Sequence, residues 1–316
     1  MLNQIHAVDL HLLRVFIAVA EERGIAAAQN RLNVAASTIS TQILNLEERL
    51  GLKLCVRGRG GFALTDEGKI VLDSTYALQR SLDEFSGTIG TLKGQLVGKI
   101  RIAIIDNLMF QPDLHLSKAL GQLRKNYPNI SFDLSSSPPD QMEENLLAQK
   151  IDIGITWVLN AAPSLSRQVI LNEKQVIVCG KGHPMFDLSD DQVSDKDLDQ
   201  ADWVARSYPL PRSFPFSRPH NSSAVAWSME TVAHTVLSGA YLGYLPFHYA
   251  QHWADRGELR VIYPEKYGYQ VPLYLAARND MLQNPLLQIC REEILKAHGV
   301  TRFDRLKKLH QSNEER

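Results

Sequence analysis

GIAAAQNRLNVAASTISTQILNLEERL, residues 24–50, has the pattern of two short helices separated by a tight turn at Asn33. The second helix starts near Ser37, and its apolar residues recur at steps of four, three and four. This spacing places them on one buried stripe of an α-helix. The stripe consists of Ile39, Ile43, Leu46 and Leu50. A preceding helix over residues 9–22, with Asp9 as its N-cap, is predicted to cover this helix-turn-helix.

The opposite face of the second helix carries short, polar, uncharged side chains. Solvated helix faces usually carry Lys and Glu, which are better helix formers than Ser and Thr. Short hydrogen-bonding groups suit the major groove of DNA, where base edges present donors and acceptors. We therefore predict that this face reads bases, and an ordinary solvated hairpin is the alternative. The predicted reading residues are Ser37, Thr38, Ser40, Thr41, Gln42 and Asn45.

Basic residues follow directly after the predicted reading helix. No acidic residue occurs between Arg49 and Arg59. The glycines of Arg57-Gly58-Arg59-Gly60-Gly61 would let a basic loop approach a phosphate backbone closely. Two short strands, 52–56 and 61–64, are predicted to flank this loop and form a wing. The predicted phosphate contacts are Arg49, Lys53, Arg57 and Arg59, the last two possible contacts in the minor groove.

A long helix is predicted after the wing. Thr65 is a hydroxyl N-cap, and the two acids that follow it suit the positive end of the helix dipole. Apolar residues then alternate at steps of four and three, which is the pattern of a coiled-coil seam. We predict a dimerisation helix with a hinge near Gly94 and Gly98, and the alternative is that the helix packs on its own chain. The seam is Val71, Thr75, Leu78, Leu82, Phe85, Ile89 and Leu92.

Length and composition limit the class of protein. The 316 residues predict two or three domains, and the net charge of −1 predicts only modest nonspecific affinity for DNA. No apolar run reaches the length of a membrane span, and no signal sequence begins the chain, so a cytoplasmic location without membrane contact is expected. The three cysteines show no metal-ligand spacing and are expected to be buried thiols. No metal ion or cofactor is expected.

The sequence changes character after Gly98, where strands alternate with helices. Such alternation predicts a parallel sheet in an α/β domain. Residues 187–199 are acidic and loop-rich, and residues 207–219 are rich in proline and aromatics and predicted to be irregular. The predicted strands are 99–105, 130–135, 151–156, 173–180, 240–245 and 271–276. The predicted helices are 110–126, 141–149, 222–238 and 282–298.

These residues together resemble the LysR-type transcriptional regulators. The resemblance is dense at the N-terminus and looser beyond residue 98. Its N-terminal part includes Leu13 to Phe16, Ala27, Arg31, Leu32, Val34, Ser37, Ile39, Ser40, Ile43, Leu46, Glu47, Leu50, Gly51, Leu64, Thr65 and Gly68. Its C-terminal part includes Arg101, Tyr127-Pro128, Asp152 to Ile155, His183-Pro184, and Gly239 through Leu245-Pro246.

The resemblance implies a multidomain architecture. It comprises an N-terminal winged helix-turn-helix (1–65), a linker helix and hinge (66–98), and a two-lobed α/β effector domain like periplasmic binding proteins (99–300). Lobe I spans about 99–163 and 270–300, lobe II about 164–269, and 301–316 is a charged tail. Proteins of this kind usually form dimers or dimers of dimers on double-stranded promoter DNA, respond to a small-molecule effector, and are expected to act with RNA polymerase.

Two positions depart from the family pattern. Where the family commonly has Ser-Gln-Pro and an Arg, this chain has Ala35-Ala36-Ser37 and Thr41. Ala36 can touch only a thymine methyl, so a site less dependent on guanine, with more shape readout, is expected. At the end of the first strand the family often offers a small hydroxyl, whereas this chain has Asp106. If its carboxylate faces the cleft, a neutral or cationic effector is favoured; the alternative is that it only caps the next helix.

The resemblance also places an effector site between the lobes. Arg206 could bind an anion there, so the effector's charge stays open at the sequence level. The candidate residues by position are Ile105, Asp106, Asn107, Ser136, Ser137, Thr156, Trp157, Arg206, Ser207, Tyr208, Met229, Pro246 and Phe247.

Other functions have less support in the sequence. No nucleophile elbow, phosphate loop or dinucleotide fingerprint is present, and the Ser, His and acidic residues are not clustered, so an enzyme is not expected. A solute-binding protein without DNA function is the main alternative, and it does not explain the match in the first 68 residues. An architectural DNA-binding protein is opposed by the weak overall basicity.

Overall fold

The computed structural model describes residues 6–58, 61–92, 96–157, 162–208 and 221–300. The chain divides into two compact units, Met1–Phe85 and Ser86–Arg316. The predicted irregular segment 207–219 and the charged tail therefore lie largely or wholly outside the described residues. In the described part of the chain, none of the helices combines the length and apolar composition needed to cross a membrane.

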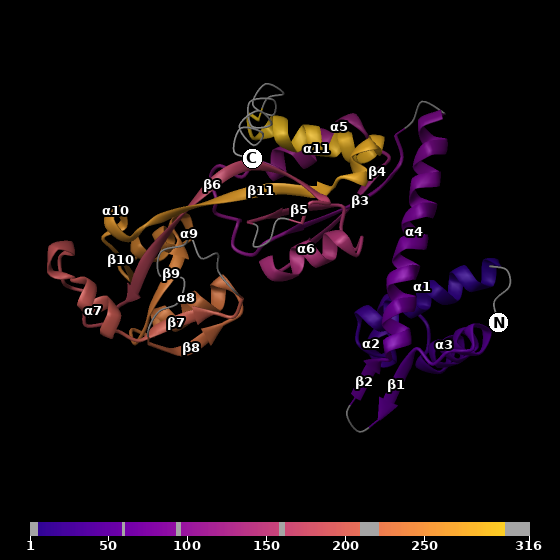
Figure 1. The fold of residues 1–316 in the computed structure, drawn as a ribbon, viewed down its shortest axis with the longest axis horizontal. Coiled ribbons are helices and arrows are strands. Elements are labelled where there is room, and N and C mark those ends of the chain that lie inside the picture. The colour runs from indigo at the N-terminus through magenta and orange to yellow at the C-terminus, as the bar shows by residue number, and fades with distance from the viewer. Residues whose placement is uncertain (1–5, 59–60, 93–95, 158–161, 209–220, 301–316) are drawn as a thin grey trace. The chain divides into compact units, whose positions relative to one another are not determined.

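The N-terminal unit is a winged helix-turn-helix followed by a long helix (Figure 1). Its apolar core contains Phe16, Ile39, Ile43, Leu46 and Leu54, all without solvent exposure. The predicted stripe of the second helix is thus confirmed, except that its last member is only half-buried. The elements are α1 (Ala7–Glu21), α2 (Ile25–Leu32), α3 (Ala36–Leu50), β1 (Cys55–Gly58), β2 (Gly61–Leu64) and α4 (Asp66–Leu92).

The start of α1 differs from the prediction. The helix begins at Ala7, so His6 occupies the N-cap position and Asp9 lies in the first turn. The Asp9 carboxylate still satisfies the helix end, because it accepts the backbone N–H of His6 at 2.8 Å. An acid at the third helical position can fulfil this role as well as an N-cap residue can.

The start of α4 is fixed against the wing. The hydroxyl of Thr65 accepts the backbone N–H of Gly68 at 2.8 Å, which confirms the predicted N-cap. The same hydroxyl donates to the carbonyl oxygen of Lys53 at 2.6 Å. A Cβ at Gly68 would lie 2.0 Å from the carbonyl oxygen of Leu54, so only glycine permits this approach of helix to wing.

The C-terminal unit is built on one mixed sheet. Among the described residues nine strands pair in the order β4-β3-β5-β11-β6-β9-β7-β8, with β10 joined to β6. The strands are β3 (Gly98–Ile104), β4 (Ile130–Ser136), β5 (Ile153–Thr156), β6 (Leu165–Gly180), β7 (Trp203–Arg206), β8 (Ser222–Ala226), β9 (Leu242–Pro246), β10 (Leu259–Ile262) and β11 (Tyr269–Arg278). The α-helices are α5 (Leu116–Asn126), α6 (Pro139–Leu147), α7 (Asp195–Gln200), α8 (Met229–Leu237), α9 (Phe247–Ala254), α10 (Pro264–Tyr267) and α11 (Pro285–Ala297).

Two long antiparallel strands join two lobes. In lobe I, β3 pairs in parallel with β4 and β5, and in lobe II, β7 pairs in parallel with β8 and β9. The prediction of a parallel sheet is therefore right only for these strands, because β5 pairs antiparallel with β11 and β9 pairs antiparallel with β6. The strands β6 and β11 pair antiparallel with each other and run through both lobes (Figure 1). The pairing of β6 with β11 thus connects one lobe to the other, with a shift of register between Leu273 and Tyr274.

The predicted helix over residues 222–238 is wrong in its first part. Residues Ser222–Ala226 form β8, because they pair with the edge of β7 that β9 leaves open. Helix α8 begins only at Met229, where the Ser228 hydroxyl accepts the backbone N–H of Thr231 at 3.2 Å. The helix predicted from residue 110 likewise begins late, at Leu116, since Pro112 interrupts the preceding turns. Strand β10 and helix α9 were not predicted.

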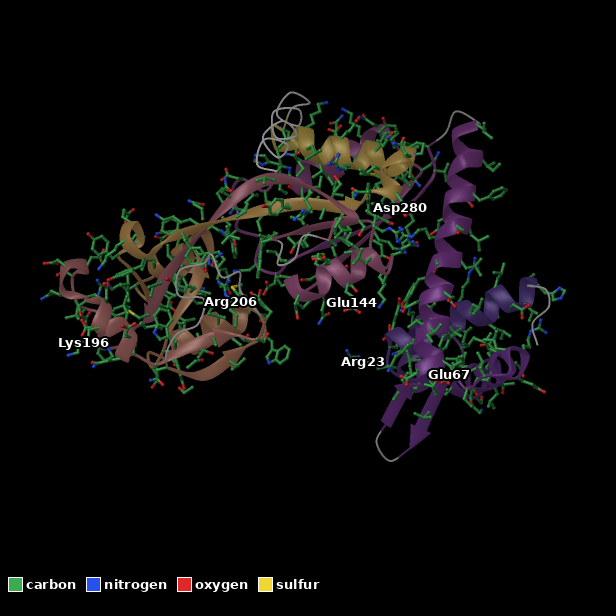
Figure 2. All side chains as sticks on the ribbon, in the orientation of Figure 1. Arg23, Glu67, Glu144, Lys196, Arg206 and Asp280 are labelled. Carbon is green, nitrogen blue, oxygen red and sulfur yellow. The ribbon has the colours of Figure 1, made fainter. Side chains whose placement is uncertain are left out.

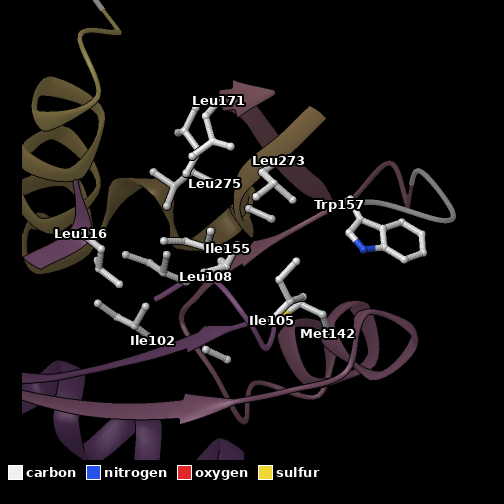
Figure 3. Packing of buried hydrophobic residues seen from close by; sticks show 14 of the residues in the cluster. Ile102, Ile105, Leu108, Leu116, Met142, Ile155, Trp157, Leu171, Leu273 and Leu275 are labelled. Carbon is white, nitrogen blue, oxygen red and sulfur yellow. The ribbon is translucent and has the colours of Figure 1, made fainter. Parts of the chain in front are cut away.

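The core of lobe I is aliphatic. Side chains from β3, β5 and β11, among them Ile102, Ile155 and Leu275, meet between the sheet and its covering helices (Figure 3). Trp157 lies at the margin of this cluster and is 5% exposed. The three cysteines are buried, as predicted. The margin of the core at the end of β5 therefore borders the region between the lobes.

Candidate functional site

Helix α3 presents the polar face that the sequence predicts. Of the six predicted reading residues, four are exposed and two are partly buried. The exposed residues are Ser37, Thr38, Thr41 and Asn45, and the partly buried ones are Ser40 and Gln42. Ala36, also partly buried, begins the helix. Because Ala35 at the N-cap has no side-chain acceptor, Gln29 of α2 accepts the Ala36 N–H at 3.2 Å. This hydrogen bond connects α2 to the start of α3.

Gln42 is held against α1. Its Nε2 lies 2.9 Å from Nε2 of His11, a hydrogen-bonding distance. Helix α3 also exposes the apolar side chain of Leu44, which is 50% exposed and was not predicted as a DNA contact. Leu44 lies one turn beyond Ser40 on α3. An exposed leucine among short polar groups could have been recognised as a candidate contact for a thymine methyl.

A surface hollow connects α3 to the wing. It is lined by side chains at the starts of α2 and α3 and by the second wing strand. Helix N-termini present backbone N–H groups that favour anions. The hollow thus places the Ser37 and Ser40 side chains beside the wing. Its lining residues are Ile25, Ala26, Ala36, Ser37, Ser40, Gly61 and Phe62.

Two of the predicted phosphate contacts form ion pairs within the unit. Arg49 forms a two-pronged bond with Asp9, and Nη2 donates to Oδ2 at 2.9 Å. Lys53 pairs with Glu47 at 2.7 Å while its side chain stays 70% exposed. Arg57 lies in β1, and nothing is described of its side chain. Arg59 lies outside the described residues.

Helix α4 carries an apolar stripe that becomes exposed along its length. The first seam residue, Val71, packs on the core of the N-terminal unit, and Thr75 is buried. Four later seam residues are exposed, Phe85 by 66%. Contiguous exposed apolar side chains of this kind often mark a surface for interaction with another protein. The exposed members are Leu82, Phe85, Ile89 and Leu92.

Asp106 joins the two lobes. It follows β3 in lobe I, and its Oδ2 accepts the backbone N–H of Met229, the first residue of α8 in lobe II, at 2.7 Å. The sequence left open whether this carboxylate faces the cleft or caps the next helix. It caps a helix, but one in the other lobe, so it also lies between the lobes. Burial raises the pKa of Asp106, and the Met229 N–H partly offsets this effect.

Asn107 and Trp157 make further contacts across the lobes. Nε2 of His248, in α9, lies 3.0 Å from the carbonyl oxygen of Asn107. The ring of Trp157 lies 5.6 Å from that of Tyr208, between centroids. Both pairs connect predicted lobe I residues to lobe II. Asn107 after β3 and Trp157 after β5 therefore both contact side chains of lobe II.

Arg206, at the end of β7, places a guanidinium group in the region between the lobes (Figure 2). Its Nη2 donates to Oε1 of Gln175 at 2.7 Å and to the carbonyl oxygen of Tyr244 at 3.2 Å. Glu173, which was not predicted as a site residue, is 4% exposed and accepts Nε2 of Gln175 at 2.6 Å. Burial raises the pKa of Glu173 to about 7, although nearby Arg206 lowers it. An acidic residue within a long, largely apolar strand was the signal that could have found it.

Other predicted effector residues have structural partners. Ser137 accepts Nδ2 of Asn145 at 3.0 Å, and the Thr156 hydroxyl donates to the carbonyl oxygen of Trp157 at 2.8 Å. Ile105 belongs to the apolar core, and Ser136 is exposed. Met229 and Pro246 are buried, and Ser207 and Phe247 are half-buried. Nζ of Lys174 lies 5.5 Å from the centre of the Phe247 ring.

The fold and these sites define a DNA-binding regulator with a two-lobed C-terminal domain. Residues 10–69 match the model of bacterial regulatory helix-turn-helix proteins of the lysR family, and residues 93–299 match the LysR substrate-binding domain. The chain belongs to the LysR family of transcriptional regulators, as the sequence predicted.

Relatives and solved structures agree with this assignment. The chain is 33% identical to the HTH-type transcriptional activator BauR of Pseudomonas aeruginosa, over 91% of this chain and 94% of BauR. It is 24% identical to the regulator PtxR of the same species, over 88% and 90% of the two chains. The crystal structure of full-length CbnR with its target DNA shares the fold, with a TM-score of 0.61 at 20% identity, covering 92% of this chain and 99% of CbnR.

Proposed function

We propose that α3 reads the major groove of promoter DNA through its exposed polar face. The observation that supports this proposal is the cluster of four exposed, uncharged, hydrogen-bonding side chains on a helix whose other face is buried. Ala36 and Leu44 contribute apolar contacts to thymine methyls. Ser40, Gln42 and the hollow beside the wing lie at the edge of this contact. The proposed phosphate contacts are Arg49, Lys53, Arg57 and Arg59.

We further propose that the protein assembles through α4. The exposed seam from Leu82 to Leu92 supports pairing with the same helix of a second copy. A two-fold axis then gives two reading helices, which match an inverted-repeat site. Assembly as a dimer, or as a dimer of dimers, follows the family pattern. Because BauR is named an activator, RNA polymerase is the proposed partner at the promoter.

The effector is proposed to bind between the lobes, where Asp106, Asn107 and Trp157 of lobe I meet Arg206, Tyr208 and Met229 of lobe II. These are proposed as its binding residues together with Ile105, Ser136, Ser137, Thr156, Ser207, Pro246 and Phe247. A molecule held there changes the spacing of the lobes. DNA binding changes only if the molecule has different affinities for the two arrangements.

Footprinting on DNA that flanks the gene of this protein tests these proposals together. We expect a protected inverted repeat of about two helical turns, whose length changes when the right metabolite is added. A variant with Thr38→Ala and Thr41→Ala should lose the protection, while its thermal unfolding stays unchanged. Absence of protection at low salt on every fragment would contradict the DNA-reading proposal, and a solute-binding protein would then be favoured.

A further inference from the structure

One loop of lobe I contacts the starts of two helices of lobe II. The loop covers residues 105–115, between β3 and α5, and the two helices are α8 and α9. Asp106 accepts the backbone N–H of Met229, the first residue of α8, at 2.7 Å. The carbonyl oxygen of Asn107 lies 3.0 Å from Nε2 of His248 in α9. Two adjacent residues of the loop therefore bind two different helices of the other lobe.

His248 is bound to this loop through both nitrogens of its ring. Its Nδ1 lies 3.3 Å from Nε2 of Gln111, whose Oε1 accepts the backbone N–H of Asp113 at 3.3 Å. Burial lowers the pKa of His248, so the ring is neutral near pH 7. A neutral ring with its proton on Nε2 satisfies both contacts, because Nε2 then donates to the Asn107 carbonyl oxygen and Nδ1 accepts from the Gln111 amide. The loop and α9 are thus joined by two matched hydrogen bonds.

The backbone of the loop is shaped for these contacts. Asn107 has a left-handed φ of 67°, a conformation that asparagine adopts more readily than most residues. Leu108, which follows it, is 3% exposed and belongs to the core of lobe I. The ring of Phe110 adds a further contact, because it stacks on His252 of α9 with 5.7 Å between the centroids. The loop is therefore anchored in its own lobe and contacts the other lobe along its length.

The Asp106 carboxylate occupies a position that favours an anion. The first N–H groups of an α-helix have no acceptor within the helix, and the helix dipole adds positive potential there. At the start of α8 the Ser228 hydroxyl accepts the N–H of Thr231. Lobe I supplies the acceptor for the Met229 N–H. Burial raises the pKa of Asp106, and Glu230 acts in the same direction, so the ionised carboxylate is held against an opposing cost. Such a contact can both form and break.

We propose that Asp106 is an internal carboxylate ligand of α8, and that through it the loop 105–115 latches lobe I to lobe II. The strands β6 and β11 join the lobes permanently, whereas the latch is a second connection that can be released. A molecule that binds between the lobes acts by keeping or breaking this latch, and a carboxylate brought to α8 competes with Asp106. The inference goes beyond the proposed effector site, because the latch consists of the chain's own residues and does not depend on any bound molecule.

Hydrogen–deuterium exchange of the full-length protein, read by mass spectrometry, tests the latch. Asp106→Ala should speed amide exchange at the starts of both α8 and α9. The expected increase is at least about tenfold, because hydrogen bonds to charged groups contribute more than those between neutral groups. Asp106→Asn keeps the size of the side chain and an acceptor oxygen but loses the charge, so its increase should be smaller at the same places. Asp113→Ala, at an exposed acid of the same loop, should leave exchange at both helices unchanged.

A small carboxylate should replace the missing side chain. Acetate added to the Asp106→Ala protein should restore slow exchange at α8 and α9, because the start of α8 again receives an anion. Chloride at the same ionic strength should not restore it, and neither salt should change the wild type. If acetate restores protection at no concentration, the assignment of this position to a carboxylate is wrong.

The spread of the effect separates a latch from a local helix cap. If exchange increases only at the start of α8, Asp106 is a cap and the latch proposal is wrong. Unchanged exchange at both helices would also overturn it. Thermal unfolding shows whether each variant is folded, and if Asp106→Ala is not, Asp106→Asn decides by the same comparison. No metabolite is present in these measurements, so failure of the latch leaves the effector and DNA-reading proposals to the footprinting test.

Discussion

Arg49 at the end of α3 is bound through two nitrogens to the carboxylate of Asp9 in the first turn of α1. Asp9 is almost fully buried, with 1% exposure. The pair connects the predicted reading helix to the helix that covers it, across 40 residues of sequence. This ion pair therefore adds to the apolar packing that holds α3 on α1.

Asp9→Asn should lower the thermal stability of the N-terminal unit near neutral pH. The Arg49 guanidinium, followed by the His6 N–H, lowers the pKa of Asp9 below its ordinary value of 3.8. A lowered folded-state pKa means that the stabilisation is present above about pH 4 and is lost as the pH falls further. Unfolding curves of both proteins between pH 3 and pH 7 measure this effect. Glu48→Gln, at an exposed acid of α3, is the matched control. Equal Tm differences at every pH would contradict the ion-pair interpretation.

Arg57→Ala should weaken binding to all DNA sequences. A phosphate contact contributes counterion release, so its loss should reduce the slope of log K against log salt by about one. The measurement is a titration of DNA at several salt concentrations. Lys53→Ala should reduce the slope alike and also lower stability, because Lys53 pairs with the buried Glu47, whereas Lys196→Ala, on the exposed helix α7, should leave the slope unchanged (Figure 2). Arg49→Ala should both weaken DNA binding and lower stability, because Arg49 also pairs with Asp9.

The sequence predicted most of the N-terminal unit because its information is local. The apolar spacing of α3 and the Thr65 cap specify helices without reference to distant residues. The bond between Arg49 and Asp9 was not predictable, because it joins residues that only the tertiary fold brings together. From the sequence, Arg49 was therefore predicted only as a phosphate contact.

In the C-terminal unit the errors occur where tertiary pairing outweighs local preference. Residues Ser222–Ala226 have a helix-compatible composition but form β8, because β7 offers an unpaired edge. The sequence left two alternatives for Asp106, a carboxylate that faces the cleft or one that caps a helix. Both apply, because the carboxylate lies between the lobes and accepts the Met229 N–H at 2.7 Å. Glu173 was missed since a lone acid in a strand pattern usually faces solvent.

Gln42→Ala should relax specificity at one base pair of the operator. If the amide reads a base, its loss should remove about 1–3 kcal/mol of discrimination at that position only. Binding to a set of operators with single-base changes provides the measurement. His11→Ala is the control, because Gln42 also contacts that imidazole at 2.9 Å. Uniform weakening by both variants would assign Gln42 to bracing α3 on α1 and remove it from the reading set.

Glu173→Gln should change how the stability of the C-terminal unit depends on pH. Burial raises the pKa of Glu173 from 4.5 to about 7 in the folded protein. For a raised pKa the stabilisation is complete below pH 4.5 and is lost as the pH rises to 7. The Tm of the variant relative to wild type should therefore increase over this interval and then level off. Calorimetry of the full chain measures it, with Glu292→Gln as control. Parallel curves from pH 4 to pH 8 would show that Glu173 does not titrate there.

Phe85→Ala should weaken self-association without unfolding the protein. Phe85 is 66% exposed on α4, so the single chain gains little from this ring. If the ring is buried in a paired seam, each copy loses ~2 kcal/mol and the dimer ~4 kcal/mol, which raises the dimer dissociation constant by roughly a thousandfold. Sedimentation equilibrium measures that constant. Ile70→Ala is the matched control, because Ile70 is 67% exposed on the same helix but lies outside the seam. If both variants dissociate as wild type does, the dimer forms through another surface, and the exposed stripe of α4 needs a different partner.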